Sequence, residues 1–554
     1  MNSLRVNCLL AVLIFASGPT FLFPLNAAAD TNSAVAPRPN IILIMADDMG
    51  WSDIGAYGGE IPTPNIDRLA ENGVRFSQFY NMARCYPTRA SLMTGLHPHQ
   101  TGIGGATNSP RGLIGDRGVY GYRGFLNRNS VTMAEVLGEA GYQTYLAGKW
   151  HLGYHTPDRW PLQRGFDRFY GSIAGATSYL KPQGGRGVML DNTPLAPPEG
   201  EYYTTDAFTD HAIRFIEDGQ HGAPFFLYLA YTAPHWPLHA KEEDIQKFVG
   251  KYRDIGWDRL REQRLQRQVE LGVLQEEQAL SPRDAGARPW DDLSDEQKEQ
   301  LDYRMAVYAA QVYSMDYNIG RVIDLLERRG DLDNTLIMFL SDNGGCAEPY
   351  DDLGGKDFSM INNENYSGAV SYGQGWANAS NTPFRRFKVW VNEGGISTPL
   401  VVHWPRGQGT EAGSWVRSPA WVPDLMPTIL EAAGATYPAK HNGYDITPYA
   451  GQRARFAFYH EAGSLTAPGW YVDDVGLSKL IARDLPLGED VTAAFVEDGL
   501  HIYRVELPSS GHLQMTLDDL DDAGLNELYA RHGAYPAAGE YDYRFTDANA
   551  ADQA

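Results

Sequence analysis

Cysteine and positive charge are both scarce in this chain. Only 3 of its 554 residues are Cys, which is too few for a disulfide framework. The 46 Lys and Arg residues are outnumbered by 69 Asp and Glu residues, so the formal net charge is -23. A surface with this excess repels phosphate groups at long range, and we therefore expect neither nucleic acid nor an anionic membrane as a partner.

Long apolar runs are also rare, and the clearest one lies at the N-terminus. Residues 1–29 contain Arg5, the run CLLAVLIFASGPTFLFPL and the sequence LNAAAD, which is the order of regions in a cleaved signal peptide. Gly18 and Pro19 interrupt the run, so we expect no stable membrane span. We therefore predict export to the periplasm or the exterior, with Cys8 lost in the signal peptide and Cys85 and Cys346 retained.

The rest of the chain has the pattern of an α/β protein. Short apolar runs typical of buried strands occur at residues 41–46, 143–147, 225–230, 336–340 and 400–403. Helical patterns with start or end signals occur at residues 132–141, 206–218 and 301–329. This alternation predicts a large mixed, mostly parallel sheet sandwiched by helices over residues 38–440.

Two segments depart from that alternation. Residues 241–298 are rich in charge and predict a solvated helical insertion, either a surface excursion or a cap over the substrate. Residues 441–546 contain short strand patterns and a final helical pattern at 525–531. They predict a smaller C-terminal α+β subdomain with an antiparallel sheet.

Polar side chains follow four of the predicted strands at the point where each strand ends: Asp47 and Asp48, Lys149 and His151, His235, and Asp342 and Asn343. Ligands of open α/β sheets bind at the carboxyl ends of the strands. We therefore expect these side chains to meet at one edge of the sheet.

Asp47, Asp48, Asp342 and Asn343 form a set with oxygen ligands only. Calcium and magnesium prefer carboxylate and amide oxygens, whereas zinc prefers imidazole or thiolate. Each pair alone could simply form a turn or a loop. The position of both pairs at strand ends favours a site for a hard cation.

The sequence CYPTRASLMTG at residues 85–95 predicts a short helix, with Pro87 in its first turn and Gly95 at its end. Cys85 would lie at the helix N-terminus with Arg89 one turn later, which is a favourable site for an anion. The same features predict a lowered pKa for Cys85 and a nucleophilic thiol, with His151 or His235 as its base. A soft thiolate is nevertheless a poor partner for a hard cation.

The C-x-P-x-R pattern within this helix resembles the signature of the formylglycine-dependent sulfatases, and its wording is closest to the bacterial arylsulfatase-like branch of the alkaline phosphatase superfamily. Other segments resemble further family motifs in the family's order: NIILIMADDMGWSDIGAYGG, GKWHLG, APHWPLHA, FLSDNGG, NTPFRRFKVWVNEGGISTPLVVHWP and HNGYDITPY. The resemblance covers about residues 38–450 and is weakest in the C-terminal region. It implies an alkaline-phosphatase-like fold and a sulfuric ester hydrolase of the arylsulfatase type.

The resemblance also implies a nucleophile and a metal. Cys85 would be oxidised to formylglycine by a separate maturation enzyme, and the hydrated aldehyde would attack sulfur. This removes the conflict between thiolate and cation, because the thiol is only a precursor. One calcium ion would be held by Asp47, Asp48, Asp342, Asn343 and residue 85.

The remaining roles are likewise implied by the resemblance. Arg89 and Lys149 would steady the hydrated aldehyde and the sulfate charge, and Asp342 would act as the base. His151 would take a proton after transfer, while His235 and Lys388 would bind the sulfate and assist the leaving oxygen. Lys388 is identified by the resemblance alone, since a lone Lys in RRFKVW is otherwise an ordinary surface charge.

The sequence leaves alternatives open. The substrate could be an aryl sulfate, a sulfated glycan or another sulfated small molecule. A phosphonate monoester or phosphodiester hydrolase could use the same nucleophile, and a catalytically silent homologue could bind sulfated glycans. The last would be favoured by a missing site residue, and all matched positions are present. A two-metal phosphatase is disfavoured because no second ligand set can be assigned.

Several other residues have neutral interpretations. We expect Cys346 to be a packed residue near the site, and His97 and His99 to have supporting or structural roles rather than to bind a metal. A further group of aromatic side chains could line a pocket for an aryl or sugar ring or pack in the core: Trp150, Trp160, Tyr179, Trp236 and Trp376.

Overall fold

The computed structural model describes residues 38–105, 120–274, 279–351, 353–355, 358–407 and 409–442, together with short strands beyond residue 443. The chain divides into two compact units, and the larger, Val35–Arg453, contains the main sheet and its helices. The predicted signal peptide at residues 1–29 lies outside the described residues. Among the residues described, no helix has the length and apolarity needed to cross a membrane.

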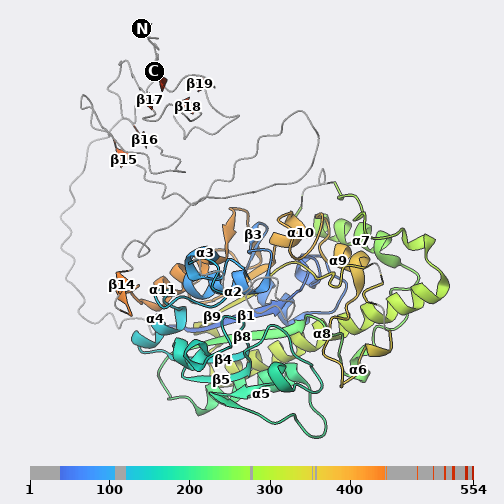
Figure 1. Cartoon of the computed structure of the whole chain (residues 1–554), viewed down its shortest axis with the longest axis horizontal. Helices are drawn as coiled ribbons and strands as arrows, with labels where there is room; N and C mark the ends of the chain where they lie inside the picture. The colour runs from blue at the N-terminus through green and yellow to red at the C-terminus, as the bar shows by residue number, and fades with distance from the viewer. Residues whose placement is uncertain are drawn as a thin grey trace. The chain divides into compact units, whose positions relative to one another are not determined.

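A ten-stranded sheet forms the centre of the larger unit (Figure 1). Its spatial order is β11 (Ser414–Val416), β2 (Val74–Phe76), β10 (Leu400–His403), β9 (Thr335–Ser341), β1 (Asn40–Asp47), β8 (Phe225–Pro234), β4 (Gln143–Lys149), β5 (Arg168–Ser172), β6 (Met189–Leu190) and β7 (Thr193–Pro194). The strands β9, β1, β8, β4 and β5 run parallel to one another. β10 runs antiparallel to β9 and β2, so the predicted mixed, mostly parallel sheet is confirmed.

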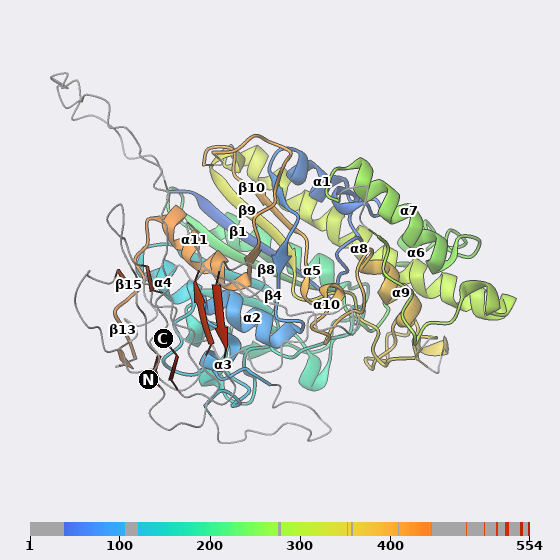
Figure 2. The ribbon, with the colours of Figure 1, turned by 90° about the horizontal axis from the view of Figure 1, so that it is seen from above.

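Both faces of the sheet are covered by helices because β1 buries apolar side chains on both sides. Ile42 and Ile44 pack in one cluster with helices α1 (Pro64–Glu71), α5 (Thr204–Asp218) and α8 (Asp295–Arg329). Ile41 and Leu43 pack in another with α2 (Cys85–Thr94), α4 (Met133–Glu139) and α11 (Leu425–Ala433). Figure 1 shows α2, α4 and α11 on one side of the sheet and α5 and α8 on the other, and Figure 2 looks onto the α2 side.

The helix ends follow the predicted capping signals. Thr132 and Glu135 form a reciprocal capping box at the start of α4, which satisfies backbone N–H groups that the helix itself cannot. Gly95 ends α2 with a φ of 65°, and Gly330 ends α8 with a φ of 70°. Glycine adopts this left-handed conformation without the steric cost of a Cβ.

The remaining elements of the larger unit are mostly short, and α7 is the longest of them. The α-helices are α3 (Pro98–Thr101), α6 (Glu242–Ile245), α7 (Gly256–Glu270), α9 (Gly373–Ser380) and α10 (Glu393–Ile396). The 3-10 helices are η1 (Gly55–Tyr57), η2 (Pro157–Arg159), η3 (Pro161–Arg164), η4 (Gly184–Arg186), η5 (Trp290–Asp292), η6 (Leu332–Asn334), η7 (Phe358–Met360) and η8 (Val422–Asp424). The strand β3 (Phe79–Tyr80) pairs with β12 (Ala420–Trp421), and β13 (Lys440–His441) pairs with β14 (Tyr444–Asp445).

The charged insertion at residues 241–298 is helical as predicted, but it is not uniformly solvated. Trp257 and Leu260 of α7 are fully buried in a third cluster with α8 and α9. Arg264, one turn later, is also fully buried: its Nη1 lies 2.7 Å from Asp53 Oδ1 and its Nε 2.8 Å from Glu60 Oε2. The solvated prediction is therefore wrong for this face, because the carboxylates of buried Asp53 and partly buried Glu60, in the β1–α1 connection, compensate the arginine.

The C-terminal segment contributes only short described strands. β15 (Arg483–Asp484) is parallel to β16 (Tyr503–Arg504), β17 (Leu517–Asp518) is antiparallel to β20 (Asp552–Gln553), and β18 (Glu527–Ala530) is antiparallel to β19 (Tyr543–Thr546). The helix predicted at residues 525–531 is wrong where β18 lies, because strand pairing overrides a weak local pattern. The α+β subdomain over residues 441–546 remains a prediction.

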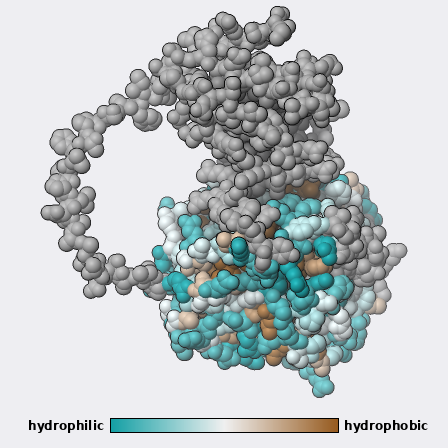
Figure 3. Space-filling view, turned by 60° about the vertical axis from the view of Figure 1, so that its left-hand side comes forward, coloured by the Kyte–Doolittle hydropathy of each residue, from teal (hydrophilic) through white to brown (hydrophobic). Residues whose placement is uncertain are grey.

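The surface of the described residues agrees with the charged composition. On the face drawn in Figure 3, hydrophilic residues predominate and hydrophobic residues appear as small separate areas. Single apolar residues on a protein surface need no special explanation.

Replacement of Arg264 by Met should destabilise the larger unit by about 3–5 kcal/mol, because it leaves Asp53 and Glu60 without their buried cationic partner. Arg68→Met is the matched control: Arg68 and Glu327 form an exposed pair with side chains 41% and 45% accessible, whose loss should cost at most about 1 kcal/mol. Denaturant unfolding of both variants measures the difference. Equal losses would contradict the buried pairing.

Candidate active site

The polar residues predicted at the strand ends lie together at the carboxyl edge of the sheet. Asp47 ends β1 and Lys149 ends β4, while His235 follows the last residue of β8 and Asp342 the last residue of β9. Because these strands are parallel neighbours, their ends bring together side chains that are far apart in the sequence. All four are buried, with at most 4% of each residue exposed.

Each carboxylate of this cluster has a cationic partner within 3 Å. Lys149 Nζ lies 2.6 Å from Asp47 Oδ2, Arg89 Nη2 lies 2.7 Å from Asp342 Oδ2, and Lys388 Nζ lies 2.8 Å from Asp48 Oδ1. These partners are themselves at most 2% exposed. Burial of a charge is costly unless the charge is paired. Each of these three pairings therefore compensates the burial of both of its charges. Lys388 thus joins the cluster from a distant segment.

Cys85 begins α2 at the centre of this group. Its Sγ lies 3.5 Å from His151 Nδ1, and ligand atoms of Cys85, Asp47 and Asp342 lie within 4.8 Å of one another. Burial raises the pKa of the Cys85 thiol, and Lys149 and Lys388 offset this only in part. The lowered pKa predicted from the helix N-terminus is therefore wrong, because desolvation outweighs the nearby cations.

The backbone is held in an uncommon conformation at two positions of the site. Asp48 has a φ of 66° and His151 a φ of 59°, a region that residues with a Cβ rarely adopt. At Asp48 this turn directs its backbone N–H toward Asp342 Oδ1 at 3.2 Å. Such conformations persist where surrounding contacts fix them, and they concentrate at functional sites.

The oxygen atoms of the cluster fit a hard cation. Asn343 Nδ2 donates to Asp48 Oδ1 at 2.7 Å and to the Gly344 carbonyl at 2.9 Å. Among the described residues, buried Asn343 Oδ1 and Asp47 Oδ1 accept no hydrogen bond. Burial and neighbouring Asp342 raise the pKa of Asp47 well above its usual value. A divalent cation would satisfy these oxygens and reduce the repulsion between the Asp47 and Asp342 carboxylates.

The two site histidines differ in their partners. His235 Nδ1 donates to the Trp236 carbonyl at 2.6 Å, and its Nε2 lies 3.3 Å from Asp48 Oδ2. His151 instead contacts Cys85. Desolvation, together with Lys149 and Arg89, lowers the pKa of His151 well below its usual value, so its imidazole is neutral and can accept a proton.

Some residues around the cluster were not predicted. Tyr228, on β8, accepts a hydrogen bond from Arg89 Nη1 at 3.3 Å. It is the one residue with a polar group in the apolar run FFLYLA, and this could have indicated its role. Glu348 accepts a hydrogen bond from Trp236 Nε1 at 3.2 Å and pairs with Arg84 at 3.3 Å. No local pattern in the sequence distinguishes Glu348 from other surface acids.

The remaining candidates lie in structural environments. His97 and His99 stack, with their Nδ1 atoms 3.2 Å apart, and His99 Nε2 lies 2.9 Å from the Tyr122 hydroxyl. Cys346 is buried, and both it and Cys85 are free thiols. Of the aromatic candidates, Trp150, Tyr179 and Trp376 are fully buried, whereas Trp160 and Trp236 are partly exposed.

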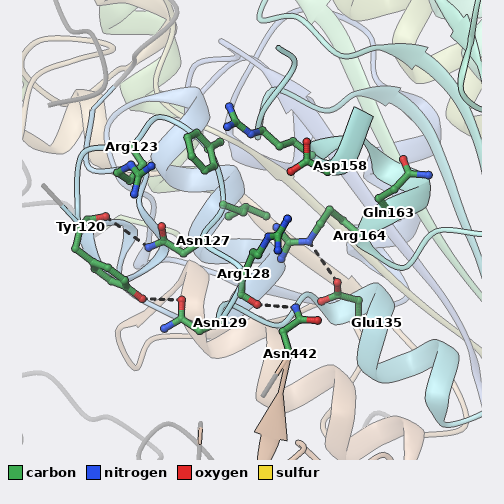
Figure 4. A pocket seen from close by; sticks show the side chains of 13 residues that line it. Tyr120, Arg123, Asn127, Arg128, Asn129, Glu135, Asp158, Gln163, Arg164 and Asn442 are labelled. Atoms are coloured by element: carbon green, nitrogen blue, oxygen red, sulfur yellow. Dashed lines mark hydrogen bonds and ion pairs between the residues drawn. The ribbon is translucent and has the colours of Figure 1, made fainter. Parts of the chain in front are cut away.

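A separate pocket of about 800 Å³ lies elsewhere in the larger unit (Figure 4). Four arginines contribute to its wall, Arg123, Arg128, Arg159 and Arg164. Arg164 is paired with Glu135 at 3.3 Å, and Arg159 stacks on Phe125. None of the residues of the charged cluster lines this pocket. The pocket is therefore distinct from the charged cluster at the sheet edge.

Comparisons with known proteins identify a family and several similar proteins. A family model described as Sulfatase matches residues 39–435. The chain is 35% identical over 423 residues to an arylsulfatase of Klebsiella aerogenes, covering 74% of this chain and 89% of that protein. It is 38% identical over 445 residues to an uncharacterized sulfatase of Schizosaccharomyces pombe, covering 76% of this chain and 79% of that protein.

Similar solved structures include that of Ps i-CgsB, which is 30% identical with a TM-score of 0.51 and covers 72% of this chain and 73% of its own. A second structure of Ps i-CgsB, in complex with k-i-k-neocarrahexaose, is similar with a TM-score of 0.50 and 29% identity, at the same coverage.

The oxygen cluster should bind a hard divalent cation. Ca²⁺ at one hundred times its Kd should stabilise the folded protein by about 2.7 kcal/mol, since the site exists only in the folded state. Asn343→Ala removes one ligand oxygen and should largely abolish this gain, whereas Asn72→Ala, at the exposed end of α1, should retain it. Thermal unfolding with and without Ca²⁺ measures both. An unchanged gain in Asn343→Ala would refute the site.

Proposed function

This chain belongs to the sulfatase family, and we propose that it cleaves sulfate monoesters through a formylglycine formed from Cys85, beside a calcium ion. Its large mixed sheet with flanking helices is the alkaline-phosphatase-like fold of sulfatases. The observation that carries the proposal is the position of Cys85, at the start of α2 with its ligand atom within 4.8 Å of those of Asp47 and Asp342.

The residues around Cys85 fit both a formylglycine at position 85 and a bound calcium ion. Asp47, Asp48, Asp342, Asn343 and residue 85 would hold the cation, and the oxygens of Asp47 and Asn343 that lack hydrogen-bond partners support this assignment. When present, the hydrated aldehyde supplies an oxygen nucleophile and the cation polarises it and neutralises sulfuryl charge. A maturation enzyme would be needed to oxidise Cys85.

The chain's own residues divide the remaining tasks. Arg89 and Lys149 offset negative charge on the sulfuryl oxygens, in the way that fixed cations stabilise phosphoryl transfer. Asp342 is the base toward residue 85. His151 Nδ1 lies 3.5 Å from Cys85 Sγ, and its lowered pKa keeps the imidazole neutral. His151 accepts a proton from residue 85 when sulfate is released.

Lys388 and His235 act on the leaving oxygen. Both contact Asp48, at 2.8 and 3.3 Å, which holds their polar atoms on one side of the cluster. A cation or proton donor beside the leaving oxygen lowers the energy of the developing alkoxide. The benefit grows as the leaving alcohol becomes less acidic.

Cys85→Ser should release at most one equivalent of alcohol per protein, because a serine sulfate ester has no second hydroxyl from which to expel sulfate. Cys346→Ser leaves the nucleophile intact and should turn over repeatedly. Single- and multiple-turnover assays with an aryl sulfate, and with a matched aryl phosphodiester for comparison, measure both. Sustained turnover by Cys85→Ser would overturn the mechanism, and faster hydrolysis of the diester by the wild type would favour a phosphodiesterase instead.

Lys388→Ala should lower kcat/KM by about 10²-fold or more for alkyl sulfates, as expected when one charge-stabilising donor is removed. The loss should be smaller for 4-nitrophenyl sulfate, whose leaving group needs little assistance. A plot of log kcat/KM against the pKa of the leaving alcohol should therefore be steeper for the variant. An equal loss for all leaving groups would assign Lys388 to sulfate binding alone.

We further propose that the protein is exported and acts on a sulfated small molecule or glycan. The N-terminal sequence pattern supports export, and the saccharide complex of Ps i-CgsB makes sulfated saccharides a necessary part of any substrate panel. N-terminal sequencing of the exported protein should begin beyond the apolar run near residue 29. An intact Met1 on a protein retained in the cytoplasm would contradict export.

A further inference from the structure

Glu348 occupies a position that the proposed mechanism does not use. Its side chain is 17% accessible and pairs with Arg84 at 3.3 Å and with Lys388 at 3.8 Å. Trp236 Nε1 also donates to its Oε2 at 3.2 Å, and the Tyr350 hydroxyl donates to its Oε1 at 3.3 Å. A single carboxylate thus contacts several segments at once.

The partners of Glu348 adjoin the charged cluster. Arg84 precedes Cys85, Trp236 follows His235, and Lys388 is itself in contact with Asp48. Arg84 is 39% accessible on its side chain and Tyr350 is 42% exposed, whereas Lys388 is buried. Glu348 therefore lies at the boundary between the buried cations and solvent.

Glu348 is charged in this position. Burial raises the pKa of its carboxyl group, but Lys388 and Arg84 outweigh burial and hold the pKa below its usual range. Its negative charge reduces the positive potential around Lys388. This effect on a bound anion scales with the charge of that anion, because Coulomb energy is proportional to the product of the charges.

The substrate and the product of ester hydrolysis differ in charge. A sulfate monoester is a monoanion, whereas inorganic sulfate is a dianion. A nearby carboxylate therefore weakens the binding of the product by about twice the free energy by which it weakens the binding of the substrate. A dianionic phosphate monoester is disfavoured to the same extent as the product.

We propose that Glu348 is a charge-selecting residue, which weakens the binding of dianions relative to monoanionic sulfate esters and thereby promotes the release of sulfate. The inference rests on the proposed function, since it concerns the same anion site. Glu348 acts through the potential at Lys388 and Arg84 rather than by contact with the reacting atoms, so it is a positioning and selecting residue.

The test compares a dianion and a monoanion of similar shape. Sulfate and sulfamate are titrated calorimetrically into wild type, Glu348→Gln and Glu348→Asp, at pH 8 with saturating Ca²⁺ and at matched formylglycine content. Glu348→Gln should tighten sulfate about three- to tenfold and sulfamate only by about the square root of that factor. Glu348→Asp, which keeps the charge, should remain near wild type.

Two further variants separate charge from structure. Arg84→Gln removes the partner cation and should weaken sulfate more than sulfamate, the opposite sign from Glu348→Gln. Glu327→Gln removes an exposed carboxylate on α8 that pairs with Arg68 and should change neither constant. In turnover assays, Glu348→Gln should lower the inhibition constant of sulfate more than the KM of an aryl sulfate.

The proposal is overturned if Glu348→Gln changes both anions by the same factor, weakens both or changes neither. It is equally overturned if the wild type binds neither anion. Because the calorimetric constants need no turnover, they remain decisive if the wild type fails to hydrolyse sulfate esters, a result that would refute the proposed function instead.

Discussion

The interaction on which the site depends is the pairing of buried charges at the carboxyl edge of the sheet. Asp47 with Lys149, Asp342 with Arg89 and Asp48 with Lys388 are nearly inaccessible to solvent. Removal of any one partner would leave a buried charge uncompensated, which is far more costly than the loss of a surface pair. Three cations balance three carboxylates, so a bound divalent cation would make the site positive within a protein of net charge -23.

The parallel sheet brings these paired charges together. The parallel strands β9, β1, β8 and β4 end at one edge, and helix α2 begins there with Cys85 in its first turn. The strands are buried on both faces, and their rigidity fixes the side chains that follow them. Sites supported by such elements hold their geometry better than sites built from loops alone.

The strands and helix caps could be predicted because their signals are local. Apolar runs marked β1, β4, β8 and β9 to within a few residues, and the capping box at Thr132 and the glycine at 330 marked helix ends. The antiparallel direction of β10 has no such signal, because an apolar run does not reveal its neighbour's direction. The burial of Arg264 depends on Asp53 and Glu60, which are distant in sequence, and so could not be predicted either.

The site residues could likewise be predicted only where a local pattern indicated them. Asp47, Asp48, Asp342 and Asn343 follow strands and could be found from the residues alone, whereas Lys388 required the family resemblance and Glu348 gave no signal. The pKa of Cys85 was predicted in the wrong direction because burial depends on the whole fold.

Mass spectrometry of the peptide containing residue 85, from natively produced protein with measured turnover of a sulfate ester, tests the central claim most directly. The account predicts formylglycine at position 85 in a fraction of molecules that rises in proportion to activity. Repeated turnover by protein that carries only unmodified Cys85 would contradict it.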